Sequence, residues 1–472
     1  MSNKIVVAID LGTSRSAYTY SIQGQAEEDV IIRVPGGSLR SMASMKTDTA
    51  VLLSSTHPHD VLAFGRSAYE RFMKETVGKH GASDHNGGVS ALTTSGPTAM
   101  LFRWFKMGLC ERRGYISVAE PVATAEGGQQ LPLMVVMTAV LRHFKRDAIS
   151  HLSSVSEVAQ TVDDVMWVVT IPAIYEDFAK RFTRVAAHNA GIISTVDSSS
   201  LQLCLEPEAA CLAVFSKDSP DLAQAGTKVM VLDCGGGTVD ITTHAVLSMN
   251  PLRLKELLPP TGGPWGSTCV DQAFMRWFKD FLGEQYYSQV RRTFEFYNLL
   301  NQWEEGKTRF GGGKKDRVRL NMVDISRQLG LDVKKLQELR VAYNDPHESP
   351  QLRVKGSKYF LVLPSPLVRS FFAPTIANMV KCLHDIKRHE FLRNLRYVFL
   401  VGGFSSSPLI QAAARGELEA GGCEVLPARR PDVAIVRGAS LFANNAEVFA
   451  TRKARLTYGV VVNMMYDRRN PE

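Results

Sequence analysis

No stretch of this sequence approaches the eighteen or so consecutive apolar residues that a membrane-spanning helix needs. The apolar stretch nearest the N-terminus, residues 4–10, is too short for the core of a secretory signal peptide. Cysteine is scarce: the 7 cysteines are scattered, and none forms a Cys-x-x-Cys pair with the spacing of a zinc site. These absences argue against a secreted or membrane-spanning protein and predict a reducing compartment, the cytoplasm, with the nucleus as a second location.

The basic residues are not clustered, although the formal net charge is +8. The densest basic runs, residues 314–319 and 452–455, lack the interleaved aromatic residues of many nucleic-acid-binding surfaces. We interpret both runs as solvated loops, and a nucleic-acid or phospholipid patch is the less favoured alternative. The composition, 45% hydrophobic and 22% charged, is ordinary for a soluble globular protein with a sizeable core.

Strand and helix patterns alternate along the 472 residues, which favours an α/β fold over segregated classes. The length predicts two large lobes or about three domain-sized units. We expect Gly- and Ser-rich surface loops at 81–96, 125–130 and 311–313. The pattern predicts strands at 5–10, 16–22, 165–171, 229–233, 239–246, 358–363 and 397–401, and helices at 175–190, 268–282, 287–309, 367–389 and 432–445.

An internal repeat is the most informative pattern in the chain. In each copy an apolar strand ends in Asp, passes through a tight Gly-containing turn and leads into a second strand. The first copy, turn one, comprises Asp10, Gly12, Thr13 and Ser14. The second copy, turn two, comprises Asp233, Gly235, Gly236, Gly237, Thr238 and Asp240. The copies lie nearly half the chain apart, which predicts a duplicated lobe.

The residue types in both turns favour a phosphate ligand. Glycine has no Cβ, so backbone N–H groups can converge on an anion, and the hydroxyl groups add donors beside them. A carboxylate at the strand end repels phosphate, but it can hold a hydrated Mg²⁺ that bridges to the phosphate oxygens. Two such turns facing each other would hold one polyphosphate from both sides. Either turn alone is a weak signal, because similar turns occur in hairpins that bind nothing.

A third element supports a nucleotide rather than a simple phosphate. The strand predicted at 397–401 breaks at Gly402 and Gly403, and the chain restarts as a helix near Pro408. A turn of this kind lets the backbone approach a flat base or a ribose closely.

Six motifs, taken in their order along the chain, resemble the nucleotide-binding domain of the seventy-kilodalton heat-shock chaperones. These chaperones belong to the superfamily that also contains actin and the sugar kinases. Residues 262–271 and 303–307 are most similar to the divergent heat-shock 70 kDa protein 12A and 12B branch of that family. The six motifs are residues 10–14, 170–173, 205–210, 233–240, 401–408 and 431–439.

The resemblance implies an actin-like ATPase fold. Two pseudo-symmetric lobes would each be built on a mixed five-stranded sheet with flanking helices, and a nucleotide cleft would lie between them. The implied boundaries are 1–226 for lobe I, 227–430 for lobe II and 431–446 for a connecting helix that returns to lobe I. Residues 447–472 would form a C-terminal tail that starts a truncated β domain.

The resemblance also implies ATP or ADP with Mg²⁺ as ligands and assigns residue roles. Asp10 and Asp233 would position the metal through water, and Asp10, Glu206 and Asp240 would form the catalytic group that orients the attacking water. Glu304 and Lys307 would flank the adenosine, although their spacing alone is more typical of a solvated surface pair. The other implied nucleotide contacts are Gly12, Thr13, Ser14, Gly235, Gly236, Gly237, Thr238, Gly266, Gly402, Gly403 and Ser406.

Two departures from the family pattern predict weak ATPase activity. Tyr69 stands where the family has a Lys that approaches the γ-phosphate, and Ser406 stands where it has an Arg that stacks on adenine. A chaperone-like ATPase with protein clients or cochaperones is the leading hypothesis. A nucleotide-sensing scaffold with negligible hydrolysis and a small-molecule kinase of the same superfamily stay open as alternatives.

Overall fold

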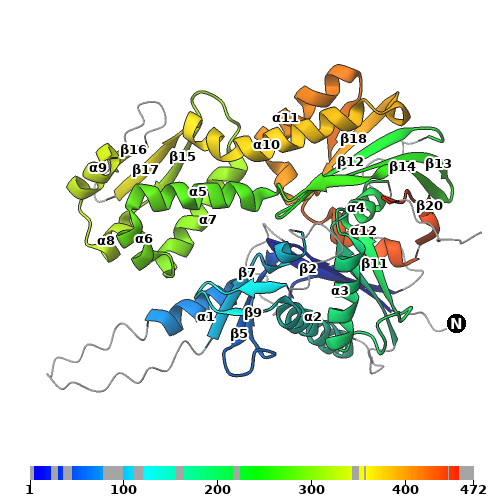
Figure 1. Ribbon diagram of the computed structural model, residues 1–472, viewed down its shortest axis with the longest axis horizontal. Helices are drawn as coiled ribbons and strands as arrows, with labels where there is room; N and C mark the ends of the chain where they lie inside the picture. The colour runs from blue at the N-terminus through cyan, green and yellow to red at the C-terminus, as the bar shows by residue number, and fades with distance from the viewer. Residues whose placement is uncertain are drawn as a thin grey trace, which may run out of the picture.

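The computed structural model describes residues 5–22, 30–35, 45–77, 99–110, 121–155, 164–215, 224–342, 350–355, 358–444 and 446–456. These residues form the predicted α/β fold, in which helices surround two mixed six-stranded sheets (Figure 1). The predicted loop at 81–96 and most of the C-terminal tail lie outside the described residues.

The first sheet has the order β11-β10-β1-β2-β3, with β4 paired to β2. The central strand β1 pairs in parallel with β10 and antiparallel with β2. The strands of this sheet are β1 (Ile5–Leu11), β2 (Arg15–Ile22), β3 (Ile31–Arg33), β4 (Thr47–Asp48), β10 (Val165–Ile171) and β11 (Leu201–Leu205). We call the part of the chain around this sheet lobe I.

The second sheet has the order β19-β18-β12-β13-β14-β20. Its strand β12 pairs in parallel with β18 and antiparallel with β13, as β1 does with β10 and β2, so the predicted duplication is confirmed. The strands are β12 (Lys228–Cys234), β13 (Val239–Met249), β14 (Leu252–Gly263), β18 (Leu395–Val401), β19 (Glu424–Pro427) and β20 (Phe449–Thr451). The part around this sheet is lobe II, and the predicted boundaries at 226, 430 and 446 stay predictions.

Each main sheet has six strands rather than the five expected. The extra strands are short, β4 on β2 and β20 on β14. A strand of two or three residues has too little alternation of apolar and polar residues to be recognised in a sequence.

Helices α4 (Glu206–Ala213) and α12 (Ala434–Asn444) lie between the two sheets (Figure 1). One buried apolar cluster contains residues of both helices together with Ala8 on β1 and Val231 on β12. The helices approach so closely that a Cβ on Gly438 would stand 1.6 Å from the carbonyl oxygen of Ala209. This packing joins the lobes at the base of the space between the sheets.

The rest of lobe I includes a three-stranded sheet of order β6-β5-β7 and a two-stranded sheet of β8 and β9. Its elements are β5 (Ala50–Ser54), β6 (Val61–Phe64), α1 (Arg66–Val77), β7 (Ala99–Arg103), the 3₁₀ helix η2 (Phe105–Leu109), β8 (Val122–Thr124), β9 (Gln130–Pro132), α2 (Leu133–Val155) and α3 (Asp177–Asn189).

The rest of lobe II includes a three-stranded sheet of order β15-β17-β16. Its elements are α5 (Ser267–Leu282), α6 (Glu284–Val290), α7 (Phe294–Arg309), β15 (Arg317–Asn321), α8 (Val323–Leu329), α9 (Val333–Ala342), β16 (Gln351–Lys355), β17 (Lys358–Pro364), α10 (Ser365–Lys387), the 3₁₀ helix η7 (Gly403–Ser406) and α11 (Pro408–Leu418). Across the described ranges, no helix combines the length and the apolar character that crossing a membrane requires.

The helix predicted at 287–309 is two helices, α6 and α7. Thr293 separates them, and its hydroxyl accepts a hydrogen bond from the backbone N–H of Phe296 at 3.3 Å. This N-cap begins a new helix where apolar periodicity alone suggested a continuous one. The other four predicted helices are confirmed to within two residues at each end as α3, α5, α10 and α12.

Candidate functional site

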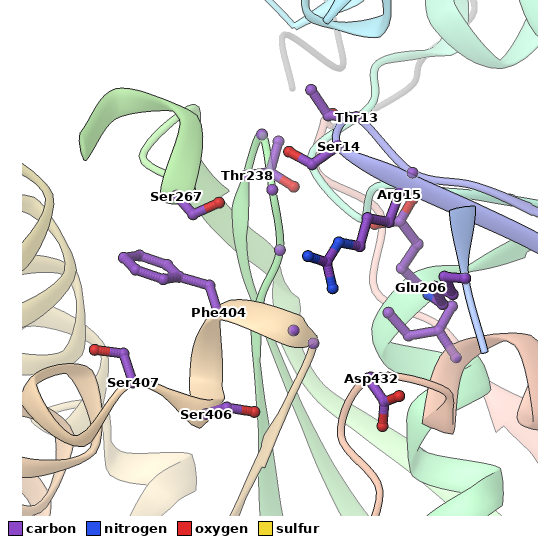
Figure 2. Close-up of a pocket in the computed structure, with 18 of the residues that line it drawn as sticks. Thr13, Ser14, Arg15, Glu206, Thr238, Ser267, Phe404, Ser406, Ser407 and Asp432 are labelled. Carbon is purple, nitrogen blue, oxygen red and sulfur yellow. The ribbon is translucent and has the colours of Figure 1, made fainter. Parts of the chain in front are cut away.

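A cavity of about 420 Å³ lies between the lobes and is lined by turn one, turn two and the turn after β18. Its wall contains most of the predicted site residues: Asp10, Gly12, Thr13, Ser14, Glu206, Gly235, Gly236, Gly237, Thr238, Glu304, Lys307, Gly402, Gly403 and Ser406. We call this cavity the cleft. Figure 2 shows side chains from both lobes directed into it.

The two Gly turns face each other across the cleft in direct contact. A Cβ on Gly236 would stand 2.3 Å from Oγ of Ser14, and a Cβ on Gly237 would stand 2.4 Å from Oγ1 of Thr13. Only glycine permits this approach, because atoms that are not bonded never come so close. The structure thus brings the two halves of the repeat together at one place.

Gly266 lies behind turn two rather than in the cleft wall. Its N–H donates to the carbonyl oxygen of Gly237 at 3.0 Å, and a Cβ on it would stand 2.4 Å from the carbonyl oxygen of Gly236. Helix α5 begins at the next residue, so Gly266 connects turn two closely to that helix.

The turn after β18 depends on the conformation of Gly402. Its φ is +81°, which L side chains rarely adopt, and an added Cβ would stand 2.3 Å from Oδ1 of Asp233. Gly402 thus lies between Asp233 and the cleft. Gly403 and Ser406 follow it in η7.

Four buried carboxylates gather on the two repeats and α4: Asp10, Glu206, Asp233 and Asp240. The hydroxyl of Thr170 donates to Oδ1 of Asp10 at 3.0 Å, and Lys46 forms an ion pair with Oδ2. The Nζ of Lys106 donates to Oε1 of Glu206 at 2.6 Å.

The two carboxylates of turn two have fewer partners. The backbone N–H of Ile174 donates to Oδ1 of Asp240 at 2.8 Å, and its Oδ2 has no partner within the described residues. Neither oxygen of Asp233 has a hydrogen-bond partner in the part of the chain that the structure describes. Burial raises the pKa of Asp240 to about 7 and raises the pKa of Asp233 well above its ordinary value.

Lys106 remains charged beside Glu206. Burial alone would lower the pKa of Lys106, but the charge of Glu206 outweighs it and the pKa lies above its ordinary value. Lys46 and Lys106 are separated from their acidic partners by 36 and 100 positions in the sequence, so no local pattern pointed to them. They are the functional candidates that the sequence interpretation missed.

Tyr69 does not lie where the lost lysine was expected to act. Its ring stacks on Tyr297 of lobe II with centroids 4.6 Å apart, and it lines a smaller adjoining cavity of about 130 Å³ instead of the cleft. Burial raises the pKa of Tyr69 to about 12. The weak hydrolysis expected from the loss of that lysine stays a prediction; near the acids, positive charge comes from Lys46, which lines the cleft, and from Lys106, which pairs with Glu206.

Lys307 is not part of a solvated surface pair. Its side chain is 3% exposed, and its Nζ binds Oδ1 of Asp271 at 2.7 Å and Oε2 of Glu304 at 2.5 Å. The charges of both carboxylates outweigh the effect of burial and raise its pKa. Trp303 also donates to Asp271, at 2.9 Å, so the side of the cleft at α7 is a fixed hydrogen-bonded cluster.

Two arginine side chains lie near the place expected for adenosine, although Ser406 replaces the arginine that stacks on adenine in the family. Arg15 extends from turn one into the cavity, toward the turn that carries Phe404 (Figure 2). Arg430 lines the same cavity, and its Nη2 pairs with Asp432 at 3.1 Å.

Two mixed sheets with facing Gly turns and buried strand-end carboxylates define a protein of the actin-like ATPase fold. The family model described as Hsp70 protein matches residues 118–339. The chain is 28% identical to "Heat shock 70 kDa protein 12A" of Homo sapiens, over 99% of this chain and 73% of that protein. It is 27% identical to "Heat shock 70 kDa protein 12B" of Homo sapiens, over 100% of this chain and 73% of that protein.

More distant similarity extends to bacterial chaperones. The "Chaperone protein DnaK" of Thermotoga neapolitana is 23% identical over 64% of this chain and 43% of its own length. The chain is thus similar to Hsp70-family proteins over nearly its whole length. This similarity supports a nucleotide-binding Hsp70-like protein.

Proposed function

We propose that the chain binds ATP or ADP with its phosphates between turn one and turn two, and that it hydrolyses ATP slowly. The observation that carries this proposal is the close approach of the turns, where a Cβ added to Gly236 or Gly237 of lobe II would stand 2.3 or 2.4 Å from the hydroxyl oxygen of Ser14 or Thr13 of lobe I. N–H groups and hydroxyls that converge from two sides suit a polyphosphate. The base and ribose would lie toward Glu304, Gly403 and Ser406, which line the same cavity.

Asp233 suits a hydrated Mg²⁺, because its two buried oxygens lack partners among the described residues. A metal ion bound there through water would supply positive charge to the phosphate oxygens. Asp10 suits it less well, since Lys46 and Thr170 already bind its two oxygens.

Glu206 and Asp240 would orient the attacking water. Asp240 is fixed by the N–H of Ile174 and keeps Oδ2 as an acceptor. Glu206 is held by Lys106, whose Nζ donates to its Oε1 at 2.6 Å, although burial still raises the pKa of this carboxyl above its ordinary value. This pairing supports slow rather than fast turnover and leaves a nucleotide-sensing scaffold as the second candidate function.

Nucleotide exchange would require the lobes to separate. Among the described residues, the contacts that cross from lobe I to lobe II beside the cleft include the Tyr69–Tyr297 stack, a 3.4 Å hydrogen bond from Tyr297 to Asp48, and a 3.8 Å contact from Arg103 to Met275. All three must break for opening. Protein clients, cochaperones and a cytoplasmic or nuclear location, expected from the family, stay predictions.

Nucleotide binding is tested with melting curves in the presence of ATP, ADP or adenosine. We expect ATP and ADP to stabilise the wild type by about 2.7 kcal/mol at a hundred times their Kd. Gly236→Ala should remove this stabilisation, because the new methyl group meets Ser14. Gly416→Ala on α11 is the matched control, since an added Cβ there meets nothing within 4 Å. A wild type that ATP and ADP leave unshifted would refute the proposal.

Hydrolysis is tested by measuring the products. Free phosphate from ATP alone indicates an ATPase, whereas phosphate transferred to an added small molecule indicates a kinase. Glu206→Gln should lower turnover on the order of a hundredfold, within the range for positioned acid-base groups, and leave ATP affinity nearly unchanged. Turnover that is insensitive to this substitution would place the catalytic group elsewhere.

A further inference from the structure

The basic residues that line the cleft differ in whether a carboxylate binds them. Within the described ranges these residues are Arg15, Lys46, Lys307 and Arg430. Three of them form ion pairs with acidic side chains. Arg15 forms no ion pair among the described residues, and its side chain is exposed. In this part of the chain, Arg15 is thus the basic residue of the cleft wall whose charge no carboxylate takes up.

The backbone around Arg15 fixes where its side chain begins. Arg15 is the first residue of β2, directly after Ser14 of turn one, and it is paired with Asp48 of β4 in the sheet. Its side chain extends across the cleft toward the turn that carries Phe404 (Figure 2). The guanidinium therefore reaches from lobe I toward lobe II.

Two acidic side chains lie close enough for the charge of Arg15 to act on them, but both have other partners. Burial would raise the pKa of Glu304, but the charges of Lys307 and Arg15 outweigh it, and Lys307 binds Glu304 directly. Burial raises the pKa of Asp48 although the charge of Arg15 opposes it, and Asp48 accepts the hydroxyl of Tyr297 at 3.4 Å. Neither acid neutralises Arg15 through a direct contact.

The acids of the cleft explain why a polyphosphate needs a cation there. The buried carboxyl groups repel a phosphate whenever they are ionised: Asp10, Glu206, Asp233 and Asp240. The N–H groups of the Gly turns offer only partial positive charges. A guanidinium suits phosphate oxygens well, because it is planar, charged and able to donate two parallel hydrogen bonds.

We propose that Arg15 binds the phosphate chain of the nucleotide across the cleft, and so makes affinity depend on the phosphates rather than on the base. This inference rests on the proposed nucleotide site. The phosphate chain then lies between the N–H groups of the two turns and the guanidinium. The positive charge that the family pattern has at the position of Tyr69 is supplied here by the residue after turn one.

The direct test is calorimetry with ADP and ATP. Arg15→Gln should weaken binding of both about ten- to a hundredfold, the range of a charge-assisted hydrogen bond. Arg15→Lys keeps the charge without the planar fork and should lie between the two. Arg327→Gln, on the exposed surface of α8, is the matched control. Wild-type affinity in Arg15→Gln would overturn the inference and leave the nucleotide site intact. A wild type that binds neither nucleotide would refute the proposed function itself.

Two further ligands separate the phosphate chain from the base. Inorganic tripolyphosphate should displace a fluorescent ADP from the wild type, and its inhibition constant should rise in Arg15→Gln by about the same factor as the Kd of ADP. Adenosine should bind both proteins equally. If the substitution weakened adenosine as much as ADP, or left tripolyphosphate unaffected, the guanidinium would act at the base and the inference would be wrong.

Melting curves without nucleotide establish that each variant is folded before its affinity is compared. We expect the wild-type melting temperature, because the side chain of Arg15 is exposed and has no ion pair among the described residues. If Arg15→Gln does not fold, Arg15→Met takes its place, since it also removes the charge and keeps an unbranched side chain. The same loss of ADP affinity is expected from it, and an unchanged affinity would overturn the inference.

Discussion

Turn one and turn two follow equivalent strands, yet their acidic residues have opposite surroundings. Asp10 is bound by Lys46 and Thr170, whereas Asp233 has no hydrogen-bond partner among the described residues. The hairpins also differ across the strand pair, where Ala17 stands opposite Asp10 and Asp240 stands opposite Asp233. The acid of turn one is therefore neutralised by an ion pair, whereas burial without a cation raises the pKa of both acids of turn two and favours their protonated forms.

This contrast indicates that the two copies of the repeat share a backbone conformation but differ in the charged groups around their acidic residues. The backbone of each turn is set by local residues, since the Asp–x–Gly order fixes where the strand ends and the turn begins. The neutralising cation of turn one, Lys46, directly precedes β4, which pairs with the start of β2, whereas the end of β14, which pairs with the start of β13 beside turn two, carries no basic residue. The two halves of the cleft should respond in opposite directions when their acids are removed.

The largest expected effect comes from exchanging the two acids for amides. Asp10→Asn should lower the free energy of unfolding of the nucleotide-free protein by about 3 to 5 kcal/mol, because it leaves the ammonium of Lys46 without its partner. Asp233→Asn should instead raise it by roughly 1 kcal/mol, since it removes the cost of burying an ionisable carboxyl without a partner. Urea unfolding of both variants measures the difference. Equal destabilisation by both substitutions would contradict the contrast between the turns.

A second prediction concerns the glycines two positions after each acid. A Cβ on Gly12 would stand 2.3 Å from the carbonyl oxygen of Arg15, whereas a Cβ on Gly235 would stand 3.3 Å from that of Thr238. Gly12→Ala should therefore cost about 1 to 3 kcal/mol of stability, as overpacking commonly does, and Gly235→Ala clearly less. Thermal unfolding without nucleotide is the measurement, and a larger loss in Gly235→Ala would mean that turn one adapts more easily.

A similar contrast occurs where the C-terminal segment meets both lobes. One carboxylate there has an ion-pair partner, and the other has few partners. Glu208 binds Arg452 through two bonds of 2.7 and 3.0 Å, while Glu256, within the described part of the chain, accepts only the backbone N–H of Lys453 at 2.5 Å. Burial raises the pKa of Glu256 to about 7. The folded state therefore holds the Glu256 proton more tightly than the unfolded chain does.

The sign of the pH effect follows from that raised pKa. The free energy of unfolding should fall as pH rises from about 4.5 to 7, by up to about 3 kcal/mol at 1.4 kcal/mol per pKa unit. Glu256→Gln should make the free energy of unfolding less dependent on pH in this range. Glu208→Gln should lower the free energy of unfolding at both ends of the range. Denaturant unfolding at pH 5 and pH 8 checks both statements. A profile unchanged by Glu256→Gln would assign the titration to another group.

The smallest effect is expected at Tyr69, outside the cleft. Tyr69→Leu should speed nucleotide release by up to about tenfold, because an aromatic pair contributes about 0.5 to 1.5 kcal/mol and this one joins the lobes. Tyr69→Phe should keep the stack and the slow release. Stopped-flow displacement of a fluorescent ADP measures the rate. A Tyr69→Lys protein with increased turnover would indicate that the side chain reaches the cleft after all.

The sequence was sufficient for features that depend on neighbouring residues. Turn one, turn two and the Gly402 turn were recognised because each is a strand followed directly by glycine, and the structure brings all three to one cavity. Lys46 and Lys106 were not predictable, because folding alone brings them to Asp10 and Glu206. Lys307 was misjudged for the same reason: its second partner, Asp271, lies on another helix.

The indole of Trp303 is an intrinsic fluorophore that is connected to the wall of the cleft. It is 1% exposed, stacks on Phe274 at a centroid distance of 4.2 Å and donates to Asp271, which also binds Lys307 at the cleft surface. Any ligand that draws Lys307 away from Asp271 changes the charge beside this ring. The change in emission of Trp303, one of the 5 tryptophans in the chain, consequently offers an intrinsic optical signal for occupancy of the cleft, with no dye attached to the protein.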